Sequence, residues 1–135
     1  MANRAPNAVE PYLRSLMRIV LGFTFSSHGL QKLLGFFGGL GGHGGTVHPY
    51  TLLWVAGCLE TVGGLLILIG LFTSPAAFIL SGEMAVAYFL HHFPHGFWPI
   101  LNGGELAVVY CFVFLYLAAA GPGPLSADRA FRGRS

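Results

Sequence analysis

Charged residues are scarce in this sequence. Only 9% of its 135 residues are Asp, Glu, Lys or Arg, whereas 54% are hydrophobic. A water-soluble domain of this length needs a largely polar surface, so the composition excludes an ordinary soluble fold and favours a chain solvated by lipid. The small net charge of +2 gives no broad basic surface, and nucleic acid is therefore not an expected partner.

Cysteine and the common cofactor motifs are also scarce. Cys58 and Cys111 lie inside long apolar runs without CxxC spacing, so we expect small buried side chains and no disulfide. The sequence has no phosphate-binding glycine loop, no dinucleotide fingerprint and no defensible Ser-His-Asp order. These absences argue against an independent enzyme that carries electrons on its own cofactor.

Four hydrophobic runs are present, at about residues 12–37, 50–72, 75–93 and 99–120. Each is near the ~20 residues that cross ~30 Å of hydrocarbon as a helix. Glycine and proline separate them: residues 38–49 are rich in Gly and His, Pro75 opens the third run, and the sequence GPGP at 121–124 ends the last. Because the connections are short, we expect an all-α integral membrane four-helix bundle with antiparallel neighbours, as one domain over 1–135 with a tail at 121–135.

Basic residues gather near the two ends of the chain. Lys32 is the exception among the seven Lys and Arg residues. The other six lie near the ends: Arg4, Arg14, Arg18, Arg129, Arg132 and Arg134. The positive-inside rule then predicts that both termini are cytoplasmic and assigns Arg18 as an inner-face charge. Residues 1–11 show no cleavage-site pattern, so the first run is interpreted as an uncleaved signal anchor.

Ionisable residues inside the apolar runs give the strongest functional signal. Three of the five acidic residues, Glu60, Glu83 and Glu105, lie there together with His28. Helical rise places Glu60 and Glu83 near the midplane and His28 and Glu105 nearer the outer surface, with Lys32 one turn above His28. Lipid cannot solvate an ion, so these side chains should face the bundle interior. We expect one polar seam in which His28 and Glu105 come within hydrogen-bonding reach and the first and fourth helices are neighbours.

Two interpretations of this seam remain open. In the first, paired or neutral carboxyls hold the helices together, as Glu105 with His28 or Lys32 could do. In the second, the seam is a proton path or a polar pocket for a small redox or transported molecule. Small residues around Glu60, including Gly64, predict close helix approach under either interpretation.

Histidines are concentrated in the two expected outward loops. His91, His92 and His95 are candidate ligands for zinc, copper or haem, because imidazole binds all three. Pro94 interrupts the regular helix that would place ligands four residues apart on one face. The pattern is more typical of interfacial loop residues than of a metal site.

The sequence resembles the DoxX family of bacterial inner-membrane proteins over most of its length. The matching segments are RIVLG at 18–22, HGLQKL at 28–33, ETVGGL at 60–65, GLFT at 70–73, NGGEL at 102–106 and GPGPLSAD at 121–128. The resemblance implies a four-helix fold in the bacterial inner membrane and redox work there, since members resemble the small subunit of a thiosulfate:quinone oxidoreductase or are associated with redox homeostasis complexes. The family pattern falls on Arg18, His28, Gln31, Lys32, Glu60 and Glu105, whereas Glu83 lies in a less distinctive stretch.

These observations lead to one principal functional hypothesis. The chain is expected to be an accessory or quinone-docking membrane subunit, with His28, Glu60 and Glu105 binding the molecule or relaying protons. Electrons would come from a partner redox protein or a larger membrane complex. Two alternatives are a non-catalytic scaffold subunit of a respiratory or redox complex and the transport of a small molecule or proton. Association of the chain with itself is left open.

Overall fold

The computed structural model describes residues 7–132, and in this part the chain is all-helical, with 75% helix and no strand. Four long helices dominate: α1 (Glu10–Leu34), α2 (Leu52–Ile69), α3 (Thr73–Ala87) and α5 (Glu105–Ala120). The short elements are the 3-10 turns η1 (Phe36–Gly38) and η3 (Phe93–His95), the π-helical turn η2 (Tyr88–His92), and the helices α4 (Pro99–Asn102) and α6 (Ala127–Phe131).

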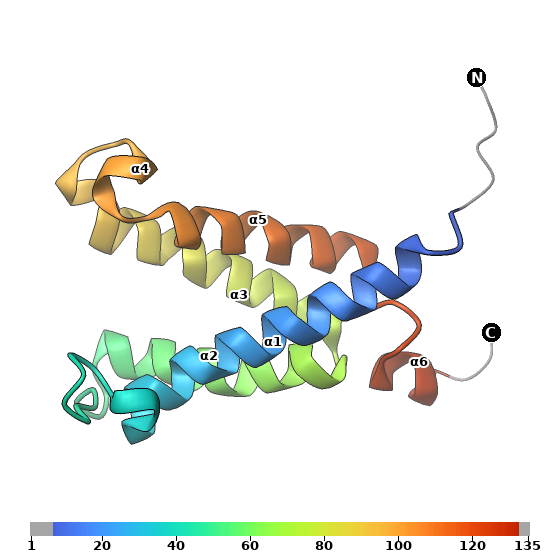
Figure 1. Cartoon of the computed structure of the whole chain (residues 1–135), viewed down its shortest axis with the longest axis horizontal. Helices are drawn as coiled ribbons and strands as arrows, with labels where there is room; N and C mark the ends of the chain where they lie inside the picture. Colours follow the sequence, from blue (N-terminus) through green and yellow to red (C-terminus); the bar gives the residue numbers. More distant parts are fainter. Residues whose placement is uncertain (1–6, 133–135) are drawn as a thin grey trace.

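The long helices form two antiparallel pairs. In Figure 1, α1 packs along α2 and α3 packs along α5, and the two pairs diverge toward the end that carries η1 and α4. Where the pairs meet, Phe25 of α1 packs edge-on against Phe114 of α5, with ring centroids 4.9 Å apart. Ile67, Leu80 and Leu117 are almost fully buried in the same core. Side-chain packing therefore joins the pairs at one part of their length and leaves them apart at the other.

Glycines allow α1 and α2 to approach closely. A Cβ on Gly64 of α2 would lie 2.5 Å from the backbone nitrogen of Ser26, and one on Gly22 would collide with the backbone of Leu68. A Cβ on Gly29 would likewise lie 2.5 Å from the backbone nitrogen of Thr61. Because backbone atoms form these contacts, no side-chain rotation could relieve a collision. The expectation of close approach around Glu60 agrees with this geometry.

The helix boundaries do not coincide with those of the hydrophobic runs. Gly35 adopts a left-handed conformation with φ of 71°, which ends α1 before Phe37. The third run begins as a helix at Thr73 rather than Pro75, and it continues beyond Ala87 as a π turn and a 3-10 turn. Gly103, with φ of 75°, splits the fourth run into α4 and α5. Hydrophobicity alone does not reveal the end of α1 at Gly35, because Leu34 and Phe36 on either side are apolar.

The segment after α5 folds back and locks the ends of three helices. The buried Arg18 side chain donates to the carbonyl oxygens of Ile67 and Leu68 at the end of α2, each at 2.7 Å. It also donates to Pro122 at 2.9 Å and to Leu125. We call this segment, residues 121–128, the C-terminal clamp.

Asp128 completes the clamp on the third helix. Its carboxylate accepts hydrogen bonds from the backbone nitrogens of Phe72 and Thr73, at 2.8 and 3.0 Å. These are unpaired N–H groups at the start of α3, so Asp128 serves as a helix cap supplied from 55 residues away.

Within the described residues, two helical segments are long and apolar enough to cross a bilayer. They are Leu52–Ile69 and Thr73–His95, with mean hydropathies of 2.1 and 1.2, and the apolar Glu105–Ala120 is shorter. Many large apolar side chains point away from the core, among them Phe23, Val62, Phe78 and Phe112, each about 60% exposed. Such an apolar exterior needs a nonaqueous environment.

Candidate functional site

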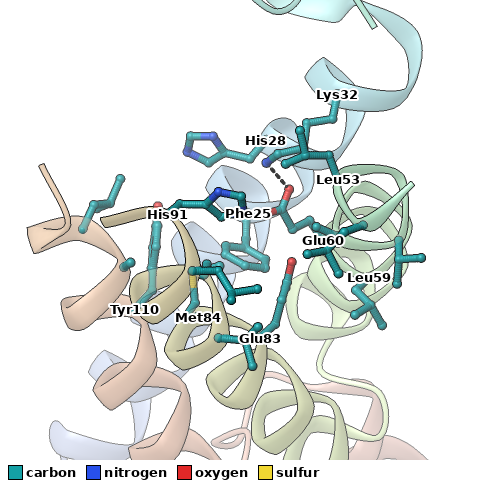
Figure 2. A pocket seen from close by; sticks show the side chains of 18 of the residues that line it. Phe25, His28, Lys32, Leu53, Leu59, Glu60, Glu83, Met84, His91 and Tyr110 are labelled. Carbon is teal, nitrogen blue, oxygen red and sulfur yellow. Dashed lines mark hydrogen bonds and ion pairs between the residues drawn. The ribbon is translucent and has the colours of Figure 1, made fainter. Parts of the chain in front are cut away.

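A cleft of about 530 Å³ lies between the two helix pairs, at the end where they diverge. Most of its wall is apolar, and ionisable side chains enter it from several helices (Figure 2). Its aromatic and ionisable lining residues include Phe25, His28, Lys32, Glu60, Glu83 and Tyr110. A concave apolar space with a few polar groups is the usual form of a small-molecule site.

Lys32 and Glu60 form the main polar contact of the cleft. The Lys32 Nζ atom lies 2.6 Å from Glu60 Oε2, joining α1 to α2 (Figure 2). The Glu60 side chain is 6% exposed and that of Lys32 is 19% exposed. The pair is therefore shielded on the carboxylate side and open on the ammonium side, a geometry that retains much of its Coulomb attraction.

His28 adds a titratable ring beside this pair. It lies four residues before Lys32, so helical periodicity brings both side chains to the same face of α1. Phe25 lies one turn further down the same face and forms part of the cleft wall. This face of α1 thus carries the charged Lys32 near the end of the helix and the aromatic Phe25 near the junction of the pairs.

Glu83 enters from α3 on the opposite side. Its side chain points toward Glu60 in Figure 2, and both of its oxygen atoms are buried. Within residues 7–132 neither oxygen has a hydrogen-bond partner. The site thus contains two nearby carboxyl groups, of which only Glu60 is paired with a cation.

The π turn positions the upper wall of the cleft. In η2 the backbone nitrogen of Phe93 bonds to the carbonyl of Tyr88, five residues earlier. This wider turn changes the helical register just where Leu90, His91 and His92 line the cleft. His92 is held by a 3.2 Å contact between its Nδ1 atom and the Asn102 carbonyl.

Asn102 organises the connection between η3 and α5. Its side-chain amide donates to the Gly96 carbonyl at 2.8 Å and to the Tyr88 hydroxyl at 3.2 Å, and its oxygen accepts from the Gly104 nitrogen at 2.8 Å. These bonds stabilise the break in the fourth hydrophobic run. The break in turn determines which side of α5 faces the cleft.

The expected polar seam is only partly assembled. The cleft brings together His28, Lys32, Glu60 and Glu83, but neither Gln31 nor Glu105 lines it. Glu105 is exposed, and in the described part of the chain it forms no hydrogen bond or ion pair with His28 or Lys32. The structure therefore has no direct hydrogen bond between His28 and Glu105, the contact that the sequence predicted.

The helix break explains this displacement. Because Gly103 and Gly104 interrupt the run, Glu105 becomes the first residue of α5, where an acidic side chain is favoured by the helix dipole. Lys32 pairs with Glu60 instead, so the ammonium group does not need a partner on α5.

The packing adds detail to two other predictions. Arg18, assigned as an inner-face charge, is buried, and four carbonyl groups of α2 and the clamp accept its hydrogen bonds. His91 and His92 line the cleft whereas His95 does not, so the three metal candidates do not converge. Among residues 7–132, no three His, Cys, Asp or Glu side chains form a possible metal site.

Phe25 and Tyr110 are site residues that the sequence reasoning missed. Their rings pack edge-on with centroids 5.3 Å apart, and both line the cleft. Phe25 could have been found from its position one turn before His28. Tyr110 offered no such signal, because its place depends on the rotation of α5 after the helix break.

Comparisons with known proteins identify a matching family and a related sequence. Residues 13–93 match the DoxX family, which is membrane-associated. The chain is also similar to an uncharacterized protein of Haemophilus influenzae, with 46% identity over 126 residues that cover 90% of this chain and 92% of that protein. No solved structure matches. From the family match and this extended similarity, the chain belongs to the DoxX family.

Proposed function

We propose that this chain is a multi-pass membrane subunit whose cleft accommodates a quinone or a similar small molecule. The observation that carries the proposal is a cleft of about 530 Å³ with apolar walls and the Lys32–Glu60 pair. Sites for drug-sized molecules typically measure about 300–1,000 Å³ and combine apolar walls with a few polar groups. A quinone has a matching division between polar carbonyl oxygens and an apolar body.

The position of the cleft also suits a lipid-soluble molecule. Several of its lining residues, including Val55, Ile79 and Val86, are half-exposed on the outer faces of α2 and α3. A ligand held there can keep its polar head near Glu60 while an apolar tail extends past these side chains into lipid. This arrangement lets the ligand enter without crossing water.

Four membrane crossings with cytoplasmic termini form part of the proposal. α1 carries Glu10, Arg14, Arg18 and Lys32, but Arg18 is internally satisfied and Lys32 is paired, which lowers the cost of placing this helix in lipid. α5 has only 16 residues, and the preceding α4 extends the same apolar segment. The bacterial inner membrane is the proposed location, by family resemblance and charge distribution.

Electron transfer is assigned to a partner redox protein or a larger membrane complex. The sequence contains no recognised cofactor fingerprint, so this subunit would dock the quinone while the partner supplies electrons. Lys32 would donate a charge-assisted hydrogen bond to a quinone oxygen, and Glu60 would keep the ammonium in place. His28 would add a second titratable donor or acceptor at the cleft mouth.

A binding experiment tests the docking role directly. The full-length protein in lipid nanodiscs is titrated with decylubiquinone, and the equilibrium affinity is compared with that of Glu60→Gln, Ala87→Phe and Glu105→Gln. Ala87→Phe places a ring inside the cleft, whereas Glu105→Gln changes an acid outside it and is the matched control. We expect binding to the wild type and the control and at least tenfold weaker binding to the two cleft variants. Equal affinity for all four proteins would contradict the assigned site.

The two alternative functions predict different results. A scaffold subunit would bind no quinone, and Glu60→Gln would leave both assembly and the activity of the complex unchanged. A transporter would show flux of its substrate across proteoliposomes without any partner present. Binding of decylubiquinone without flux therefore favours the docking role over both alternatives.

A further inference from the structure

Glu83 is the buried ionisable group that the proposed docking contacts do not use. Both carboxyl oxygens are shielded from solvent and lack a hydrogen-bond partner within residues 7–132. The side chain nevertheless points into the cleft toward Glu60 (Figure 2). A buried polar group without a partner is destabilising, so the presence of Glu83 at this position needs a chemical explanation.

The charges around the cleft restrict the form of Glu83. The titratable groups come from every surrounding element: His28 and Lys32 from α1, Glu60 from α2, His91 and His92 from η2, and Tyr110 from α5. Lys32 is the only permanent cation among them, and its ammonium group already bonds to Glu60. A second carboxylate would be a buried negative charge beside another, without a cation of its own.

We infer that Glu83 is held as the neutral acid and that its O–H donates a hydrogen bond to a carbonyl oxygen of the ligand in the cleft. Uptake of one proton removes the unbalanced charge and converts an acceptor-only group into a donor. The Lys32–Glu60 pair and the Glu83 acid then offer two donors from opposite walls. An apolar molecule with carbonyl acceptors is the ligand class that such donors fit.

The protonation part of this inference stands independently of any ligand, whereas the hydrogen-bond part rests on the proposed docking function. Infrared spectroscopy of the ligand-free, full-length protein tests the first part. The carboxylic acid C=O stretch, recorded near neutral pH in H₂O and D₂O, should be present in the wild type and in Glu105→Gln. It should be lost in Glu83→Gln. A band that persists in Glu83→Gln, or its absence from the wild type, would overturn the inference.

Titration with decylubiquinone tests the second part. Glutamine keeps the shape and a donor N–H but cannot ionise, so Glu83→Gln should bind within about twofold of the wild type at neutral pH. Glu83→Leu removes the donor and should bind about three- to tenfold more weakly, as expected for one neutral hydrogen bond. A Glu83→Leu affinity equal to that of the wild type would refute the hydrogen bond.

The pH dependence separates Glu83 from its titratable neighbours. Wild-type affinity should fall in alkaline solution as Glu83 loses its proton, while Glu83→Gln, which retains all the other groups, should lose less. Parallel pH profiles for the two proteins would overturn the assignment of the proton to Glu83. If neither protein binds decylubiquinone but the infrared band depends on Glu83, the docking proposal fails and the neutral acid stands. If both proteins bind decylubiquinone and the infrared band is absent from the wild type, the docking proposal stands and the neutral acid fails.

Discussion

Lys32 and Glu60 form a contact that both joins two helices and brings charge into the cleft. The pair joins α1 and α2 at a distance of 2.6 Å, and its carboxylate is almost completely buried. Removal of either partner leaves a charge that the surrounding apolar side chains cannot stabilise, whereas removal of both leaves none. A substitution of Lys32 or Glu60 alone should therefore change both the stability of the protein and the charge inside the cleft.

A double-mutant cycle measures this coupling. We expect Lys32→Met to destabilise the protein by roughly 3 kcal/mol, because the Glu60 carboxylate loses its cation. The double variant Lys32→Met/Glu60→Leu should recover most of that loss, since no isolated charge remains. Thermal or denaturant unfolding in nanodiscs provides the measurement. Additive losses in the double variant would show that the two residues do not stabilise each other.

Asp128 gives a second prediction at this scale, and it concerns pH. Burial tends to raise the pKa of its carboxyl, but hydrogen bonds from the Thr73 and Phe72 backbone and the nearby Arg132 together bring the pKa below its ordinary value. Because the folded state favours the ionised form, the stabilisation is present above the unfolded pKa of about 4 and is lost as pH falls through the lower folded value.

The Asp128→Asn variant isolates this contribution. We expect it to be about 1 kcal/mol less stable than the wild type at pH 7, because a neutral amide is a weaker cap for α3. The difference should shrink toward zero in acid, where the wild-type carboxyl is protonated. Unfolding midpoints across the acid range would check this, and a difference independent of pH would contradict the assigned role.

The helices themselves are fixed by small residues and interruptions more than by hydrophobicity. The α1–α2 contact depends on glycines that leave no space for a side chain, and the α4–α5 break depends on Gly103 in a left-handed conformation. Each feature determines which face of a helix meets the cleft. The effect of a glycine substitution on the stability of the protein should therefore depend strongly on how close the neighbouring helix lies.

Gly64 and Gly82 form a matched pair for this prediction. A Cβ on Gly64 would lie 2.5 Å from the Ser26 nitrogen, whereas one on Gly82 would meet no atom within 4 Å. We expect Gly64→Leu to separate α1 from α2 and lower stability by at least about 3 kcal/mol, at or above the usual overpacking range. Gly82→Leu should be neutral or slightly stabilising because leucine favours helix more than glycine. Comparable unfolding midpoints for the two variants would place Gly64 on an open helix face.

The sequence was sufficient to predict the helical class, the approximate runs and the cluster of His28, Lys32, Glu60 and Glu83. It was insufficient for Glu105, because the local turn at Gly103 changes the direction of α5 without changing its apolar character. It was also insufficient for Arg18, since its four carbonyl partners lie 49 to 107 residues away in the chain. Periodicity reports the face of a continuous helix and contains little information about such distant contacts.

At the scale of the whole molecule, the two ends of the helix pairs have different roles. One end is joined by the C-terminal clamp and the aromatic core, while the other diverges around the cleft. The first turns of α1 and the helix α6 share the clamped end, as Figure 1 shows. Together with the terminal arginines, this arrangement supports a single orientation in the proposed inner membrane.

Topology reporters test that orientation. Fusions near Met1 and at Ser135, which lie outside the described residues, should both report the cytoplasm. A tag placed within residues 41–45 should be accessible from the opposite side, because the intervening helix α1 would cross the membrane once. A periplasmic signal from the C-terminal fusion would reduce the number of crossings by at least one and overturn the proposed arrangement.

The C-terminal clamp also has a consequence for biosynthesis. Arg18 leaves the ribosome early, yet two of its carbonyl partners belong to Pro122 and Leu125 near the end of the chain. In the proposed membrane arrangement, a nascent chain that has inserted α1 and α2 offers this guanidinium the carbonyls of Ile67 and Leu68 but still lacks those of Pro122 and Leu125, which lie 104 and 107 residues after it. The clamp residues thus complete the hydrogen bonding of Arg18 only after α5 has been synthesised, and a chain that stopped before residue 122 would leave part of this guanidinium without acceptors.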